Sequence, residues 1–264
     1  MKLPRSTDLA MLIPAQARSL IRDVLGLRVK RHQLFVEVVA DKSGLEVGGP
    51  SGLFRDSGLC PLYRYVASLD NCVFARETIW EGTREDRSAY VFDARRSPGL
   101  NYVLDATNFD GIEDNAYDFL LSSHCLEHVA NPVKALKEWQ RVVKPGGAVV
   151  VVLPNYRKTF DHRRQPTPVS HMLEDFERST TEEDQYHIEE VLALHDFALD
   201  PIGGAHEAFR DRVLKNARYR TVHHHVFDEN NSRELLDSVG MAVKFVEVSV
   251  PHHIVLLAQV SKSA

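Results

Sequence analysis

The feature that most constrains the fold is a glycine-rich turn directly after an apolar segment. Residues 44–52 read Gly-Leu-Glu-Val-Gly-Gly-Pro-Ser-Gly, and the apolar residues 34–40 and 44–47 favour a strand that runs into this turn. Glycine permits backbone conformations closed to other residues, so the chain can pass close to a ligand here. Backbone N–H groups favour an anionic ligand group, whereas the Glu46 carboxylate would accept hydrogen bonds from hydroxyl or ammonium groups. We therefore expect a nucleotide-type cofactor that carries an amine.

Polar residues recur where the next three candidate strands end. Strand 65–69 is followed by Asp70, strand 101–104 by Asp105, and strand 117–121 by Ser-Ser-His. In an open α/β sheet the C-terminal ends of the strands line one crevice, and ligands bind there. An acidic residue after the second strand is suited to binding ribose hydroxyls. The sequence therefore predicts a cofactor site at this edge of a sheet.

The best helix in the sequence runs from 132 to 143. Asn131 can cap it, Pro132 suits its first turn, and Pro-Gly-Gly at 145–147 ends it. Residues 148–153 are then almost all valine and leucine, as expected of a strand buried on both faces of a parallel sheet. This alternation predicts an α/β fold with a doubly wound, mostly parallel sheet.

Together these residues resemble the class I S-adenosylmethionine-dependent methyltransferases. The similar segments are the Glu46 turn, Asp70, Asp105-Ala106, Tyr-Asp-Phe at 117–119 running into His-Cys-Leu-Glu-His at 124–128, and Lys-Pro-Gly-Gly at 144–147. The resemblance implies a seven-stranded sheet with a C-terminal antiparallel hairpin, formed here by strands 242–250 and 253–260 after a helix at 232–239. It also implies that the long connection before that helix is an inserted substrate-side segment.

The resemblance further implies S-adenosyl-L-methionine as the cofactor and assigns residues to it. Glu46 and the turn would bind its amino-acid part, Asp70 its ribose hydroxyls, and Asp105 with Ala106 its adenine. Ser123 and His124 would lie under the methionine end. One departure is that Pro50 stands where the family has its middle glycine, and proline fixes φ and lacks an N–H donor. The full set of expected cofactor-binding residues is Glu46, Gly48, Gly49, Pro50, Ser51, Gly52, Asp70, Asn71, Asp105, Ala106, Ser123 and His124.

The length of 264 residues fits one elaborated domain spanning 1–264. We expect an N-terminal helical extension at 1–33, a cofactor-binding core at 34–154, a substrate-side insertion at 155–227, and a C-terminal helix and hairpin at 228–264. An amphipathic helix at 9–27 in the extension would serve either as scaffold packing or as a lid over the cofactor.

Charge and composition exclude several classes of partner. The net charge of −5, with basic residues spread along the chain, argues against a nucleic-acid partner. The absence of an 18-residue apolar run and of a secretory segment predicts a soluble, cytoplasmic protein without membrane contact. Three cysteines without metal spacing, Cys60, Cys72 and Cys125, fit reduced thiols. The oligomeric state stays open.

The insertion is rich in histidine. It holds eight of the 13 histidines: His162, His171, His187, His195, His206, His223, His224 and His225. His162 is our expected general base, with His124 as the alternative, and Asp161 could fix a histidine tautomer. Arg163 and Arg164 could hold an anionic substrate group, with His187 and His224 beside them. An equally open interpretation is a solvated face with hydrogen bonds between segments.

Two histidine pairs in the insertion have helical spacing. His171 with Glu174 and His187 with Glu190 are each three residues apart, so each pair could present two metal ligands. No complete ligand motif is present, and we predict no metal ligands. Side chains alternate between the two faces of a strand, so if residues 223–225 form a strand, at most two of their three histidine rings can enter one site.

We therefore predict an S-adenosylmethionine-dependent methyltransferase that methylates an oxygen of a sugar or other small polar acceptor. Residues 70–72, 80–82, 161–164 and 223–225 resemble a bacterial methyltransferase subgroup associated with glycan contexts, which implies a small-molecule or glycan acceptor. The alternatives are an NAD-dependent oxidoreductase or epimerase, and a non-catalytic cofactor-binding partner subunit. Against the oxidoreductase, Glu46 precedes the glycines, Pro50 interrupts the turn, and no Tyr-x-x-x-Lys pair is present.

Overall fold

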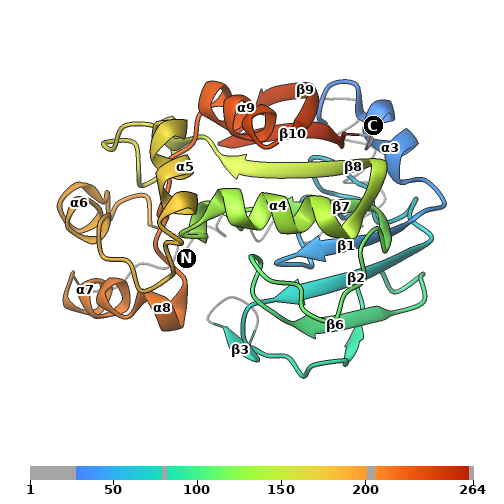
Figure 1. The fold of residues 1–264 in the computed structure, drawn as a ribbon, viewed down its shortest axis with the longest axis horizontal. Coiled ribbons are helices and arrows are strands. Elements are labelled where there is room, and N and C mark those ends of the chain that lie inside the picture. The colour runs from blue at the N-terminus through green and yellow to red at the C-terminus, as the bar shows by residue number, and fades with distance from the viewer. Residues whose placement is uncertain (1–27, 79–81, 201–205, 262–264) are drawn as a thin grey trace, which may run out of the picture.

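An eight-stranded sheet forms the centre of the computed structural model, which describes residues 28–78, 82–200 and 206–261 (Figure 1). The strand order is β5-β6-β2-β1-β7-β8-β10-β9. The strands are β1 (Ser43–Val47), β2 (Ser68–Val73), β5 (Ala89–Tyr90), β6 (Gly99–Val103), β7 (Tyr117–Ser123), β8 (Val143–Pro154), β9 (Met241–Ser249) and β10 (His253–Val260). A separate two-stranded ribbon pairs β3 (Glu77–Thr78) with β4 (Gly82–Thr83).

The sheet is parallel at its centre and antiparallel at its ends. Strands β6, β2, β1, β7 and β8 run parallel, whereas β10 pairs antiparallel with both β8 and β9. The predicted fold class and the C-terminal hairpin are thus confirmed. The predicted strand count of seven is one short, because the edge strand β5 pairs antiparallel with β6.

Helices cover both faces of the sheet, and alternate residues of each strand enter a different core. Helices α4 (Pro132–Val142), α5 (Val169–Glu177) and α9 (Glu229–Ser238) cover one face, whose core includes Val149 and Val151. Helix α3 (His32–Val39) and the loop after β1 cover the other face, whose core includes Val150 and Val152. Because β8 is buried on both sides, its sequence is a continuous apolar run.

The predicted strand at 34–40 is wrong, because this segment forms helix α3. Its buried residues Phe35, Val36 and Val39 lie at helical spacing and pack in the second core. A run in which nearly every residue is apolar shows no period, so it fits a buried strand and a helix equally well.

Helix α4 confirms the prediction for its region. Asn131 caps it by accepting a hydrogen bond from the Lys134 N–H at 2.9 Å. Helix α9 begins three residues earlier than predicted, because Asp228 and Asn231 form a reciprocal capping box. The predicted N-terminal helix at 9–27 lies outside the described residues.

The insertion folds into short helices beyond the end of the sheet to which the β1 and β8 arrows point (Figure 1). After the 3-10 turn Tyr156–Lys158 come α5, α6 (Ile188–Leu194), α7 (His206–Leu214) and α8 (Asn216–Tyr219). Helices α6 and α7 share a small core with Val222, formed by Ile188, Val191, Phe209 and Val213. The insertion is therefore a packed cap over the C-terminal ends of the strands.

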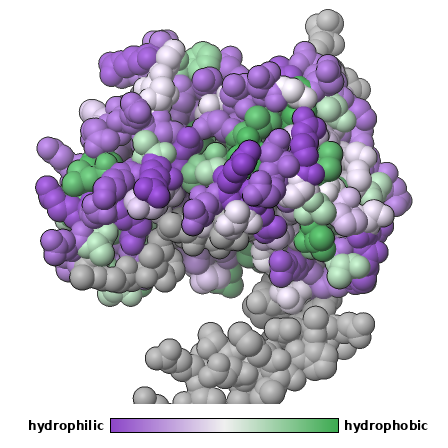
Figure 2. Space-filling model, turned by 90° about the horizontal axis from the view of Figure 1, so that it is seen from below, coloured by the Kyte–Doolittle hydropathy of each residue, from purple (hydrophilic) through white to green (hydrophobic). Residues whose placement is uncertain are grey.

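The surface seen in Figure 2 is mainly hydrophilic, with apolar residues in separate small groups. Within the described part of the chain, no helix has both the length and the apolar character needed to cross a membrane. The three cysteines are free thiols.

Candidate active site

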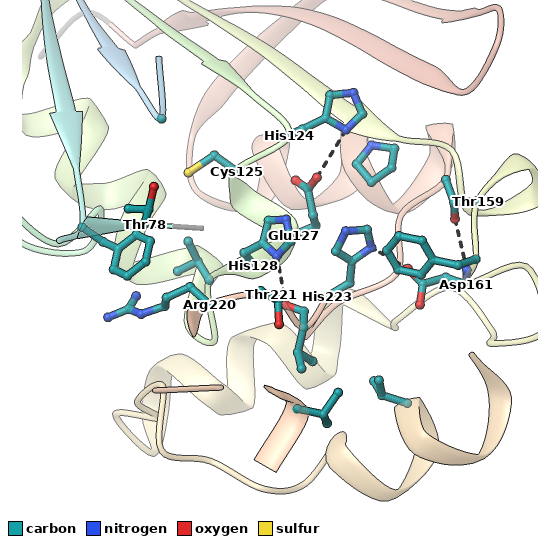
Figure 3. A pocket seen from close by; sticks show the side chains of 18 of the residues that line it. Thr78, His124, Cys125, Glu127, His128, Thr159, Asp161, Arg220, Thr221 and His223 are labelled. Carbon is teal, nitrogen blue, oxygen red and sulfur yellow. Dashed lines mark hydrogen bonds and ion pairs between the residues drawn. The ribbon is translucent and has the colours of Figure 1, made fainter. Parts of the chain in front are cut away.

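A cavity of about 480 Å³ lies between the C-terminal ends of the parallel strands and the insertion. Its first part is lined by residues at the ends of β1, β2, β6 and β7, including Gly48, Phe74, Ala106 and Cys125. Its second part is lined by histidines and carboxylates. They include His124, Glu127, His128, Asp161, His223 and His252. The cavity thus joins the predicted cofactor edge of the sheet to a polar wall (Figure 3).

The glycine turn is held from behind by Asn71 on β2. The Asn71 Oδ1 accepts a hydrogen bond from the Gly49 N–H at 2.9 Å, and its Nδ2 donates to the Gly49 carbonyl at 3.2 Å. Gly48 has φ +80°, which favours glycine, and it lines the cavity. The peptide bond before Pro50 is cis. A side chain at Gly49 would collide with the hydroxyl of Tyr90, so this position requires glycine.

Glu46 lies fully buried under the turn instead of in the cavity. Its carboxylate accepts hydrogen bonds from the Tyr63 hydroxyl at 2.8 Å, the Tyr90 hydroxyl at 2.5 Å and the Ser51 N–H at 3.0 Å. Burial and the Glu46 charge raise the pKa of both tyrosines, so both hydroxyls keep their protons and donate. Glu46 therefore fixes the shape of the turn. Pro50, Ser51 and Gly52 do not line the cavity either.

Asp70 lies inside β2, because that strand extends to Val73 and does not end at 69 as predicted. Its carboxylate accepts hydrogen bonds from the Leu100 N–H and the Tyr117 hydroxyl, each at 2.8 Å. These bonds tie β2 to its neighbours. Neither Asp70 nor Asn71 is among the residues that line the cavity.

Asp105 and Ala106 follow β6, as the sequence predicts. The Asp105 carboxylate accepts hydrogen bonds from the Thr107 N–H and hydroxyl and pairs with Arg220 at 2.7 Å. Burial opposes ionisation, but Arg220 and the Thr107 donors outweigh it and lower the pKa of Asp105. Ala106 lines the cavity, and its carbonyl accepts a hydrogen bond from the Trp139 indole. Arg220 from the insertion thus reaches the expected adenine side of the cavity.

Ser123 ends β7, and His124 follows it with φ 51°, an uncommon backbone conformation for a residue with a side chain. His124 Nε2 lies 2.9 Å from His253 Nδ1, and His124 Nδ1 lies 3.4 Å from a Glu127 carboxylate oxygen. Burial and His124 lower the pKa of His253 to about 3, so His253 stays neutral near pH 7. Of the predicted catalytic residues, His124 is the one that lines the cavity.

Glu127 lies between His124 and the rings of His128 and His223 (Figure 3). Its side chain is fully buried, and among the described residues its carboxylate has no close, well-aligned hydrogen bond, only the longer contact of 3.4 Å to His124 Nδ1. Burial alone would raise its pKa, but His124, His128 and His223 lower it. A buried ionised carboxylate therefore faces the cavity.

Asp161, which the sequence suggests as a partner that fixes a histidine tautomer, contacts His223. The Asp161 carboxylate lies 2.5 Å from His223 Nδ1, and both residues line the cavity. Burial would raise the pKa of Asp161, but His223 and Arg164 lower it to about 2. Burial would lower the pKa of His223, but Asp161 outweighs it and raises that pKa. The pair fixes the His223 ring at the cavity wall.

The predicted insertion residues lie outside the cavity. His162 and Arg163 both contact Asp196, at 2.8 and 3.1 Å. Arg164 is fully buried and binds Asp161, Glu190 and the carbonyls of His223 and His224. His187 lies against His171, and His224 contacts Asn216 and Glu182. The cavity-lining set contains none of His162, Arg163, Arg164, His187 and His224.

Sequence reasoning missed Glu127 and His223 as cavity residues. Glu127 belongs to the quoted His-Cys-Leu-Glu-His segment, so its position after β7 was a usable signal. His223 belongs to the histidine triplet, which forms no strand, and its three rings enter different surroundings.

Three side-chain groups among the described residues bring ligand atoms close enough to hold a metal ion. Two of them, His124 with His252 and His253, and Glu127 with His128 and His223, include cavity residues. The third, His171 with His187 and His225, lies outside the cavity.

The chain is similar to known methyltransferases over part of its length. A family model described as a methyltransferase domain matches residues 71–151. The chain is 38% identical over 73 residues to the demethylmenaquinone methyltransferase of Paenarthrobacter aurescens (strain TC1), covering 25% of this chain and 28% of that protein. The chain thus spans little more than a quarter of that relative's length.

Solved structures show similarity at low identity. An S-adenosylmethionine-dependent methyltransferase from Methanosarcina mazei is 15% identical, covering 87% of this chain and 98% of that chain, with a TM-score of 0.49. A methyltransferase in complex with the Haloferax volcanii Trm112 methyltransferase activator is 11% identical, covering 95% of each chain, with a TM-score of 0.49. The match at 71–151 confirms the predicted resemblance to the class I methyltransferases.

Proposed function

We propose that this chain, which carries a methyltransferase domain match at 71–151, transfers a methyl group from S-adenosylmethionine to a hydroxyl oxygen of a sugar or other small polar acceptor. The observation that carries this proposal is the single cavity that joins the strand ends to a wall of histidines and carboxylates. Open α/β sheets bind their ligands at this edge. The polar wall offers several hydrogen-bonding groups to an acceptor rich in hydroxyls.

The first part of the cavity suits the cofactor. At Gly48 the backbone itself lines the cavity, because glycine has no side chain. Among the described residues, Cys125 alone lies within 4 Å of the position that a Cβ on Gly48 would take, so the space there is open. Asp105 and Ala106 would face the adenine, while Ser123 and His124 would lie under the methionine end. Glu46, Asp70 and Asn71 would act indirectly by holding the turn and the strands that carry these residues.

The bound cofactor would supply a methyl group attached to a positively charged sulfur. That sulfur leaves readily as a neutral thioether when the methyl group is transferred. The protein then has to hold an acceptor oxygen in line with that methyl and accept the acceptor's proton. The enclosed cavity provides the positioning. His223, fixed by Asp161, offers a hydrogen-bonding group to the acceptor.

His124 is the proposed general base. When its Nδ1–H points to the Glu127 carboxylate at 3.4 Å, its Nε2, which lies 2.9 Å from His253 Nδ1, is left as the basic nitrogen. The Glu127 charge stabilises the protonated ring that forms when the proton arrives. His162 is less suitable, because its ring contacts Asp196 away from the cavity.

The test is transfer of tritium from methyl-labelled S-adenosylmethionine to a panel of monosaccharides and nucleotide sugars. We expect His124→Gln to lower the rate of transfer by about 100-fold or more at saturating cofactor, a larger loss than any change in S-adenosylhomocysteine affinity. The matched control is His162→Gln, which we expect to transfer at the wild-type rate.

Equal losses in both variants would overturn the assignment of His124. Cofactor binding without transfer to any hydroxyl acceptor would instead favour a binding protein over an O-methyltransferase.

A further inference from the structure

We propose that His171, His187, His225 and Asp175 form a binding site for a zinc-like divalent transition-metal ion, separate from the cavity. The four residues come from three places in the chain. His171 and Asp175 lie one turn apart on α5, His187 immediately precedes α6, and His225 lies shortly before α9. A metal ion here would fasten two helices of the insertion to the segment that returns to the core.

The distances suit a four-coordinate ion. One ring nitrogen of each histidine lies within 4.8 Å of those of the other two. His171 Nε2 lies 3.1 Å from His187 Nε2 and 3.4 Å from Asp175 Oδ2. The His225 ring lies beside the same oxygen, with its outer nitrogen Nε2 at 3.7 Å. Tetrahedral ligands at zinc–nitrogen distances near 2.0–2.1 Å are about 3.3 Å apart. The group therefore needs only small adjustments to close around an ion.

Asp175 provides an independent sign of a missing ligand. Asp175 is 8% exposed as a residue, and one carboxylate oxygen, Oδ1, accepts a hydrogen bond from the Thr180 hydroxyl at 3.0 Å. The other oxygen, Oδ2, is buried and makes no hydrogen bond within the described residues. Leaving a buried carboxylate oxygen unpaired is costly, whereas a bound cation would satisfy it.

His225 has the arrangement expected of a metal ligand. Its Nε2–H donates to the Ala130 carbonyl at 3.1 Å, which fixes the ring and leaves Nδ1 as the nitrogen with a free lone pair. Nδ1 is buried and, in the part of the chain that is described, has no hydrogen-bond partner. A backbone carbonyl on the far ring nitrogen is a common support for ligating histidines.

Two of the three histidines, His187 and His225, have lowered pKa values. Burial and the nearby positive groups Arg164, His224 and His171 lower the pKa of His187 to about 3. Burial lowers the pKa of His225 well below its usual value, and the Ala130 carbonyl opposes this only in part. The negative charges near the histidine group are the carboxylates of Asp175, Asp184, Glu182 and Glu190.

Three imidazoles and one carboxylate point to zinc or a metal of similar preference. The four protein ligands would leave no open position, and none of the four residues lines the cavity. The site is therefore structural. Its ligands differ from the sequence-based pairs, because Glu174 turns outward to Arg178 at 3.5 Å while Asp175 points inward.

Metal analysis of the full-length protein tests this proposal. The chain would be produced without a histidine tag in zinc-supplemented medium, dialysed against metal-free buffer, and measured by elemental mass spectrometry. We expect about one zinc per chain in the wild type, and strong loss of zinc in His171→Ala and in Asp175→Ala. The matched control His162→Ala, in the same insertion, should keep its zinc.

A measurement on the wild-type chain covers the case in which a variant fails to fold. After metal removal by a chelator, added Co²⁺ should give the intense visible absorption of tetrahedral coordination at one equivalent, and added zinc should abolish it. Binding of neither metal by the wild type, or full zinc retention in both site variants, would overturn the proposal. None of these readouts depends on methyl transfer.

Discussion

Glu46 shows how an acidic residue before a glycine turn can act without touching the ligand. Its buried carboxylate is surrounded by three donors, the hydroxyls of Tyr63 and Tyr90 and the N–H of Ser51. Hydrogen bonds to a buried charge are stronger than those between neutral groups. The motif was readable in the sequence, but its partners were not, because Tyr63 lies in the loop after β1 and Tyr90 in the edge strand β5.

Replacing Glu46 by glutamine should therefore destabilise the fold. Glu46→Gln keeps the side-chain volume but removes the charge that the two tyrosine hydroxyls share, at an expected cost of about 2 kcal/mol in the free energy of unfolding. Urea denaturation measures this cost. As controls, Tyr63→Phe and Tyr90→Phe each remove one of the two hydroxyl hydrogen bonds to the carboxylate. An unchanged urea midpoint in Glu46→Gln would refute this role for the carboxylate.

Asp161 should make stability depend on pH in the acid range. The pKa of its carboxyl is lowered to about 2 in the folded protein against an ordinary value of 3.8, so the stabilisation is fully present above about pH 4. It is lost as the pH falls from about 4 to about 2, and a shift of this size corresponds to about 2 kcal/mol.

The measurement compares wild type with Asp161→Asn by urea denaturation between about pH 1.5 and pH 7, a range that includes both the folded and the unfolded pKa of the carboxyl. The difference in stability between the two proteins should shrink toward low pH. A constant difference across the range would contradict the account.

At the scale of elements, the strands and helices with distinct patterns were predictable. Asn131 and Pro132 marked the start of α4, and the valine run of β8 identified a strand buried on both faces. Helix α3 was not predictable, because its apolar run has no period and only packing in the second core decides between helix and strand.

Arg164 links the elements of the insertion to one another. Its buried guanidinium joins Asp161, Glu190 on α6 and the carbonyls of His223 and His224. In sequence it looked like a substrate ligand, since the pattern of charges does not show which arginine is buried.

Arg164→Met should loosen the cap over the cavity, because it removes one of the two positive partners of buried Asp161 and the donor to the carbonyls of His223 and His224. We expect about 3 to 5 kcal/mol of destabilisation, and faster hydrogen–deuterium exchange concentrated in residues 155–227. Arg163→Met is the matched control, since Arg163 is half exposed and pairs with Asp196 at 3.1 Å. Equal exchange in both variants would argue against this linking role.

At the scale of the whole molecule, the sheet and the insertion share one cavity between them. The position of the cavity at the ends of successive strands was readable in the sequence, because topology alone brings those ends together. Its lining was readable only in part: Gly48, Ala106 and His124 line it, whereas Glu46 and Asp70 do not. The polar wall was not readable, because it joins Glu127 after β7, Asp161 after β8 and His223 at the end of the insertion. Contacts of that range depend on how the insertion folds back.

The central claim is that this cavity binds S-adenosylmethionine, and calorimetry of the purified full-length chain tests it most directly. S-adenosylmethionine, S-adenosylhomocysteine and NADH would each be titrated into wild type, into Ala106→Leu, which narrows the cavity, and into Ala242→Leu at an exposed position of β9. The account predicts one site with micromolar affinity for the two sulfur compounds, retained in Ala242→Leu, weakened in Ala106→Leu, and no binding of NADH. Binding of NADH alone, or binding of neither sulfur compound to the wild type, would contradict it.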